Sequence, residues 1–326
     1  MPPKRSAEEK LEALQDIIEH DTQASVQAAL QGALKEKNNF FVAKAAGWTG
    51  EHLYYDLIPD LVDAYQRFLK TPLKSDKTCA AKIAIIRALY DLNYNDVEFF
   101  RGGLRYRQLE PVWGGHVDTA VDIRCSSAMG LAATNHYRVM IDLVELLHDE
   151  EHIARIGAIK AMEMVDPYQA ELVLRHKILQ GDQEPEVIAQ CFSSLMQVAA
   201  EESLNFVAAR LHDSNVSVCE SAALALGESR LDDALDILID ESRNIILHNA
   251  FRRSLFRAIA LQRKDRAFDY LLSIIEKEDN SAACDVVEVL AIYNYNKVLE
   301  EKVKKLVSNK NSQGIIQVFQ QFWTNS

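Results

Sequence analysis

Residues 218–227 read VCESAALALG, and residues 123–132 read IRCSSAMGLA. The two stretches match position for position: an apolar residue, three variable residues, two small residues, one variable residue, and then a small and an apolar residue. Further copies begin at Ile153 and Val187, and less regular ones lie near residues 249 and 282. The starts are spaced by about 30 to 34 residues, a period typical of proteins built from stacked repeats.

A second amphipathic segment lies between successive copies. In Val139–Leu147, Leu204–Leu211 and Ala267–Ile275, apolar residues recur at i, i+3, i+4 and i+7, which is the period of a helix. Short polar joints such as residues 148–150 leave room only for tight turns between helices. One helix pair cannot bury both of its apolar stripes, so each pair must pack against its neighbours. The sequence therefore predicts an all-α fold, an α-α superhelix (solenoid) of stacked antiparallel helix pairs.

The repeat resembles the HEAT-repeat family, including the HEAT-like variant seen in phycobilin lyases, with the form D-x-x-V-R-x-x-A-A-x-A-L-G. Asp213–Gly227 and Asp122–Ala132 carry this form best, with Arg124 at the basic position. In the other copies Ala154, Ile188 and Cys219 stand at that position. The resemblance covers residues 120–310. It implies the solenoid fold and a concave surface that serves other proteins.

The repeat frame also predicts the organisation of the chain. We expect N-terminal capping helices over residues 1–40 and a repeat solenoid over residues 41–326, with an insertion at 93–118. Within the solenoid, Gly227 is placed like a helix C-cap. Residues 315–323 (IIQVFQQFW) form the expected closing helix, whose Trp323 either covers the last repeat or stays partly exposed.

Net charge and cysteine spacing indicate which partners are disfavoured and in which cellular compartment the protein is expected. The chain has 36 Lys and Arg against 48 Asp and Glu, a net charge of −12, which disfavours nucleic acid and anionic membranes as partners. No stretch is long and apolar enough to predict a membrane span. The five cysteines have no metal-ligand spacing, so we expect reduced thiols and a cytoplasmic protein.

The segment 93–118 departs from the repeat. It reads NYNDVEFFRGGLRYRQLEPVWGGHVD and holds two glycine pairs, 102–103 and 114–115, which permit unusual backbone angles or a close approach to a ligand or a packed neighbour. We expect a long non-helical insertion. One interpretation is a binding loop in which arginines hold carboxylates or phosphates and Trp113 offers a stacking face. The other is a structural plug, in which Phe100, Tyr106 and Trp113 fill a groove and the arginines pair with Glu98, Glu110 and Asp118. The candidate binding residues are Arg101, Arg105, Tyr106, Arg107, Trp113, His116, Asp118 and Arg124.

A second basic cluster lies in residues 252–266, directly after the acidic block 231–241 (LDDALDILIDE). Because adjacent helices of a solenoid bring such blocks together, we expect ion pairs between helices. The alternative is a basic strip on the concave wall.

Catalytic motifs are missing from the sequence. None of the nine histidines belongs to an HExxH motif, and the His-Glu pairs of HEAT-type iron hydroxylases do not occur. His148 and His152 have the i, i+4 spacing of metal ligands, but a predicted helix boundary separates them. No phosphate-binding loop is present either. We therefore predict no metal, no cofactor and a non-catalytic scaffold that binds a protein or peptide through the concave surface and the 93–118 loop. The alternative is an enzyme or a lyase-like protein that binds a small anionic ligand at residues 101–118.

Overall fold

The computed structural model describes residues 7–243 and 249–323. The first six residues of the predicted cap and the last three of the predicted solenoid therefore lie outside the described residues. Helices account for almost all regular structure in the described part, with one two-stranded sheet, which confirms the predicted all-α class. By its internal contacts the chain divides into two units, Met1–Gln169 and Ala170–Ser326.

The first unit begins with α1 (Ala7–His20), and the longer helices after it form successive pairs. In each pair the earlier helix is called the first helix and the later one the second helix. Its other elements are α2 (Gln23–Leu34), α3 (Asn39–Glu51), η1 (Tyr55–Leu57), α4 (Ile58–Leu69), α5 (Pro72–Ser75), η2 (Lys77–Cys79), α6 (Ala80–Asp91), α7 (Val97–Leu104), β1 (Leu109–Val112), β2 (Gly115–Asp118), α8 (Val121–Ala133), α9 (Val139–Leu146), α10 (His152–Met162) and the start of α11 (Pro167–Gln180).

The second unit repeats the same alternation without a sheet in its described residues. It holds most of α11, followed by α12 (Pro185–Val198), α13 (Ala200–Ala208), η3 (Ala209–His212), α14 (Val216–Ser229), α15 (Asp232–Ser242), α16 (Asn249–Leu261), α17 (Asp265–Lys277), α18 (Asn280–Leu290), η4 (Ala291–Tyr293), α19 (Lys297–Lys310) and α20 (Gln313–Trp323).

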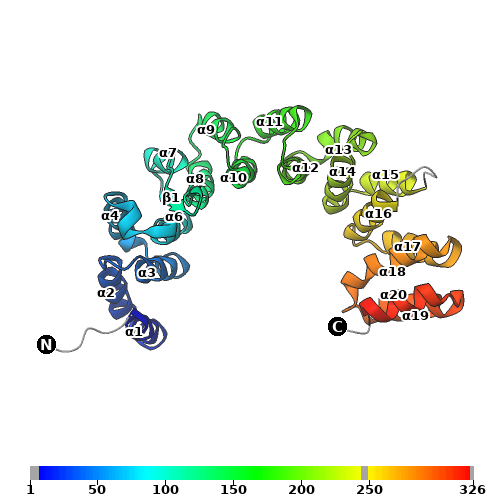
Figure 1. Ribbon diagram of the computed structural model, residues 1–326, viewed down its shortest axis with the longest axis horizontal. Helices are drawn as coiled ribbons and strands as arrows, with labels where there is room; N and C mark the ends of the chain where they lie inside the picture. Colours follow the sequence, from blue (N-terminus) through cyan, green and yellow to red (C-terminus); the bar gives the residue numbers. More distant parts are fainter. Residues whose placement is uncertain (1–6, 244–248, 324–326) are drawn as a thin grey trace. The chain divides into compact units, whose positions relative to one another are not determined.

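The second helices of the pairs stack into a continuous row within each unit. In the first unit α3 packs against α6, α6 against α8, and α8 against α10, as Figure 1 shows. In the second unit α12, α14, α16, α18 and α20 follow one another in the same way. From α8 onward these helices begin at residues 121, 152, 185, 216, 249, 280 and 313, so the predicted spacing is confirmed at 31 to 33 residues. The boundary expected at residue 40 stays a prediction.

Small residues in the second helices let neighbouring backbones approach. A side chain added at Gly227 would come within 2.8 Å of the Cα atom of Ala258 in the next repeat. Gly227 lies inside α14, and the residue after that helix, Arg230, has a positive φ of 56°. The prediction that Gly227 is a C-cap was therefore wrong: glycine is needed there because two helices touch.

The C-terminal helix closes the second unit. Trp323 is buried against the preceding repeat, and its indole N–H donates to the carbonyl of Val287 at 2.9 Å. Of the two alternatives for this side chain, the structure shows that it covers the last repeat.

The second basic cluster pairs with carboxylates of neighbouring helices, as predicted. Lys264 forms an ion pair with Asp232, and Arg266 forms one with Asp236. The expected partner was wrong for Arg252 and Arg253, which both bind Asp285 of α18, at 2.6 and 2.9 Å, rather than the acidic block before them. The reason is that the second helix of a pair faces the next repeat as well as the preceding one.

Candidate functional site

The segment 93–118 consists of a helix followed by a hairpin. Its first half forms α7, which packs against α8 as the first helix of an ordinary pair. The expectation of a non-helical insertion was therefore wrong for these residues. Gly103 allows the packing, since an added Cβ atom would lie 2.0 Å from the hydroxyl of Ser127 in α8. The departure from the repeat is thus confined to the residues between α7 and α8.

These residues form a β-hairpin that projects apolar side chains into solvent. Strands β1 and β2 pair antiparallel from Leu109 with Asp118 to Val112 with Gly115, and the turn consists of Trp113 and Gly114. Gly114 has a φ of +89°, in the left-handed region that favours glycine at the second position of such a turn. Trp113 is fully exposed, so the alternative in which it fills a groove was wrong for this residue, whereas Phe100 is buried. The other exposed apolar side chains of the hairpin are Leu109, Val112 and Val117.

Arg124 anchors the base of the hairpin from inside the protein. Its side chain is completely buried, and Nη1 donates to Asp118 at 2.6 Å and to the carbonyl oxygen of Tyr106 at 3.1 Å. Nη2 donates to Asp149 of the next repeat at 3.1 Å. Nε lies 2.9 Å from the same carboxylate and contributes to the ion pair, but its N–H does not point at an oxygen and makes no hydrogen bond. Burial by itself raises the pKa of Asp118, but the amides of Ala120 and Gln108 and the Arg124 guanidinium outweigh it and hold that pKa below its usual value.

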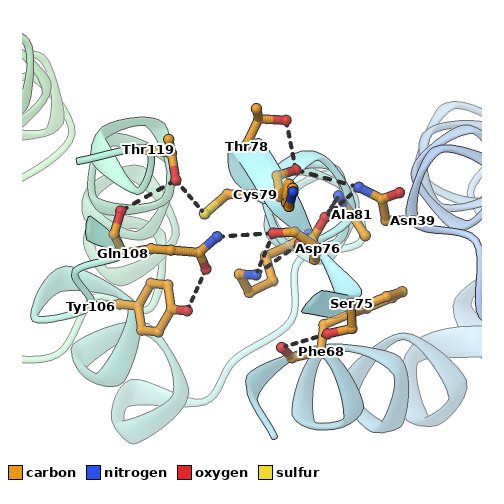
Figure 2. A network of polar contacts seen from close by, with 12 residues as sticks. Asn39, Phe68, Ser75, Asp76, Thr78, Cys79, Ala81, Tyr106, Gln108 and Thr119 are labelled. Atoms are coloured by element: carbon orange, nitrogen blue, oxygen red, sulfur yellow. Dashed lines mark hydrogen bonds and ion pairs between the residues drawn. The ribbon is translucent and has the colours of Figure 1, made fainter. Parts of the chain in front are cut away.

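A second polar network fixes the other side of the hairpin base, as Figure 2 shows. The amide of Gln108 donates to the carbonyl of Asp76 at 2.9 Å and to Glu110 at 2.8 Å, and Tyr106 donates to the Gln108 oxygen. Asp76 in turn forms an ion pair with Lys82 at 2.9 Å, in which both side chains are fully buried. The hairpin is therefore tied to α6 as well as to α8.

Glu110 completes this network against a strained stretch of backbone. Its carboxylate accepts the amide N–H of Thr78 at 2.6 Å and the hydroxyl of Thr119 at 2.8 Å. Thr78 and Cys79 both have positive φ, 60° and 58°, which is unusual for residues with a side chain. Burial by itself raises the pKa of Glu110, but the hydrogen bonds from Gln108, Thr119 and the Thr78 amide lower it overall. The network thus holds the chain in a conformation that it would otherwise avoid.

The remaining candidate arginines also face carboxylates of the chain. Arg101 binds Asp142 at 3.1 Å and Glu98 at 2.7 Å, and Arg107 pairs with Asp149. Arg105 is 69% exposed and makes only long contacts, 3.8 and 3.9 Å, to carboxylates of α9. Arg105 and Arg107 line a hollow of about 260 Å³ together with Asp142, Glu145, His148 and Asp149. Three carboxylates therefore surround two arginines in this hollow.

The eight candidate residues fall into two groups. Arg107, Asp118 and Arg124 lie in the ion pairs at the hairpin base, and Tyr106 donates a hydrogen bond there. Arg101 is also paired, with Glu98 of its own helix and Asp142 of α9. Trp113 and His116 are exposed in the turn and in β2, and Arg105 is exposed at the end of α7. Sequence reasoning missed Asp76, Lys82 and Gln108.

One signal could have found part of this network. The spacing of six residues between an aspartate and a basic residue recurs as Asp76–Lys82, Asp118–Arg124 and Asp149–Arg155. In the third copy the guanidinium of Arg155 donates to the carbonyl of Asp149 at 2.8 Å. Arg155 therefore occupies the basic position of that repeat. The sequence frame placed Ala154 there, one residue too early.

Neither a metal centre nor a membrane span is evident in the described part of the chain. No three His, Cys, Asp or Glu side chains among residues 7–243 and 249–323 are grouped so that they could hold a metal ion. Within the same residues, every helix is too short or too polar to cross a bilayer.

No family model and no curated protein matches the chain. Among solved structures it is similar to the CpcE–CpcF complex of phycocyanin lyase from Nostoc sp. PCC7120, at 13% identity and a TM-score of 0.35, over 77% of this chain and 91% of that one. Human deoxyhypusine hydroxylase matches at 13% identity and a TM-score of 0.31, over 90% and 93%. Kap121p bound to Pho4p matches at 12% identity and a TM-score of 0.48, over 98% of this chain and 44% of that one. These likenesses concern the helical-repeat fold alone.

Proposed function

We propose that the protein is a non-catalytic scaffold that binds a protein or peptide partner, and that the hairpin of residues 109–118 is a principal contact. The observation that carries this proposal is the exposure of four large apolar side chains, with Trp113 at the tip, on a base that buried ion pairs hold in place. Exposed apolar clusters are typical of interaction surfaces.

The chemistry of the hairpin suits a protein partner better than a small anion. Tryptophan and arginine dominate the binding energy of many protein interfaces. Trp113 in the turn is exposed, and so is Arg105 at the end of α7, before the hairpin begins. Because the base of the hairpin is already ordered, less conformational entropy is lost when a partner binds. The other arginines are matched by carboxylates of the chain, which supports a structural role for them.

The proposal is tested by affinity capture with single variants of the full chain. Trp113→Ala and Arg105→Ala remove exposed groups that have few contacts inside the protein, so both should lose the captured partner while the melting temperature stays unchanged. Tyr295→Ala is the matched control, because Tyr295 is an exposed aromatic residue of the second unit. Equal recovery of every captured protein by Trp113→Ala and by Tyr295→Ala would refute the role of the hairpin.

Arg107→Glu tests whether a loss of capture can come from destabilisation of the protein alone. Arg107 pairs with the buried Asp149, so its reversal should lower stability as well as capture. Loss of capture with this variant alone would therefore count as a folding effect and contradict a contact at the hairpin.

A further inference from the structure

A groove runs along α1 and α3 of the first unit, on the exposed side of the row of second helices. It has a volume of about 700 Å³, and a second hollow of about 490 Å³ between α3, α6 and α8 shares Gly47 with it. The two hollows therefore border the same residue of α3, and together they are called the groove below.

Equivalent faces of α3 and α6 line this groove. On α3 the lining residues Phe40, Lys44, Gly47 and Glu51 follow the spacing i, i+4, i+7 and i+11, which places them on one side of the helix. On α6 the residues Ala80, Ala84, Arg87 and Asp91 have the same spacing. The groove thus crosses two repeats at corresponding positions.

Two glycines of α3 show that the helices touch at one point and leave space at another. A Cβ atom added at Gly50 would lie 2.9 Å from the Cα atom of Ala88, so α3 and α6 are in contact there. A Cβ atom added at Gly47 would meet nothing within 4 Å. Gly47 therefore faces an open space beside a close helix contact.

The α3 end of the groove is apolar. Leu11 of α1 and Phe40 and Trp48 of α3 line it, and Phe40 is 69% exposed. An exposed phenylalanine beside an open groove offers a surface that a large apolar side chain can cover, with a gain from the hydrophobic effect.

The rim of the groove carries an excess of negative charge. Its cations are Lys44 and Arg87, and its carboxylates are Glu8, Glu51, Asp91 and Asp122. The single ion pair between these groups that the structure shows in the described residues, Arg87 with Asp122, is 3.9 Å long with both side chains more than half exposed, so it is weak. Burial raises the pKa of Asp91 although Arg87 opposes the rise. The carboxylates outnumber the cations by two, which favours a cationic partner.

We infer that this groove binds an extended peptide segment of a partner protein, with one large apolar side chain seated at Gly47 and basic side chains at the α6 and α8 rim. Packed helices lie about 8–10 Å apart, and an extended chain advances about 3.3 Å per residue. A segment that crosses from α3 to α6 and then to α8 therefore places successive contacts about three residues apart, with basic side chains facing the α6 and α8 rim. This inference extends the proposed function to a second surface and does not depend on Trp113.

The probe for the test is a fluorescein-labelled Gly/Ser peptide with one Phe and with Lys three and six residues after it. Two matched peptides carry Phe→Ser or both Lys→Glu. Binding to the full chain is measured by fluorescence anisotropy. The proposal expects the probe to bind more tightly than either matched peptide, and binding no tighter than theirs would overturn it.

Substitutions in the protein locate the site. Gly47→Leu fills the groove and should lower the affinity for the probe by about tenfold or more, which is the effect of losing one apolar anchor. Gly32→Leu is the matched control, because Gly32 lies in α2 and an added Cβ atom there also meets nothing within 4 Å. This control and Trp113→Ala should leave the affinity within about twofold, since distant sites act independently. Equal binding by Gly47→Leu and Gly32→Leu would refute the groove as the site, whatever the hairpin variants show in capture.

Discussion

Arg124 and Asp149 belong to consecutive helix pairs and form an ion pair in which both side chains are buried. Nη2 of Arg124 donates to Oδ1 of Asp149 at 3.1 Å, and Asp118 at the hairpin base binds the same guanidinium at 2.6 Å. One arginine therefore joins its own repeat, the next repeat and the hairpin. The position of the hairpin depends on a contact that also holds two repeats together.

Arg124→Met should destabilise the first unit strongly. Removing one partner of a buried ion pair costs about 3–5 kcal/mol, because here the buried carboxylates of Asp118 and Asp149 would keep only the half-exposed Arg107 as a counter-charge. Urea unfolding followed by circular dichroism measures this change. Lys35→Ala breaks the more exposed pair with Asp60 and should cost no more than about 1 kcal/mol. Equal effects of the two substitutions would contradict the account of Arg124.

Glu110 should make the stability of the hairpin base depend on pH. Its pKa in the folded protein is lowered, whereas an unfolded glutamate titrates at about 4.3. The folded state therefore gains stability above that unfolded value and loses it as the pH falls through the folded value. Urea unfolding should show that the difference in unfolding free energy between the wild type and Glu110→Gln is largest at about pH 7 and shrinks toward about pH 3. A difference that stays constant with pH would contradict the stabilising role of the ionised carboxylate.

Gly227→Ala should destabilise the second unit even though alanine favours helices. The added Cβ atom would lie 2.4 Å from the backbone oxygen of Ala258, and backbone cannot move aside as a side chain can. We expect a loss of about 1–3 kcal/mol, typical of overpacking. Gly32→Ala has open space and should stabilise by up to about 1 kcal/mol. Thermal unfolding distinguishes the two, and a gain in stability for Gly227→Ala would show that the helices are not in contact there.

The cysteines should differ in reactivity according to burial. Burial raises the pKa of Cys191 to about 12 and that of Cys79 to about 11, and both thiols are fully covered. Cys284 is only partly covered. Iodoacetamide labelling followed by peptide mass spectrometry should therefore modify Cys284 first in the folded protein and all five thiols in denaturant. Labelling of Cys191 as fast as Cys284 without denaturant would contradict its position in the core.

The repeat could be predicted from the sequence because it depends on local patterns. The small-residue frame of 123–132 and 218–227 corresponds to α8 and α14, whose packing needs small side chains at fixed spacing. The helix in residues 97–104 could not be predicted in the same way. A glycine pair is as compatible with a loop as with a close helix contact, and only the position of Ser127 decides between them.

The ion pairs of the candidate site were predicted less well because their partners come from other repeats. Arg101 binds Asp142, which is 41 residues further along the chain, and Arg107 binds Asp149, 42 residues away. The pairs expected from nearby sequence were only partly right: Arg101 does bind Glu98, while Glu110 faces Thr78 and Gln108 instead of an arginine. Which repeat supplies the counter-charge depends on stacking, and a local pattern does not specify it.

Photo-crosslinking from residue 113 tests protein binding by the hairpin most directly. A benzoyl-phenylalanine placed at position 113, in the exposed turn, is irradiated in cells and compared with the same group at exposed Tyr295 of the second unit. The account predicts a discrete adduct of one partner protein from position 113 and none of that mass from position 295. The absence of any adduct specific to position 113, with the protein folded, would contradict it.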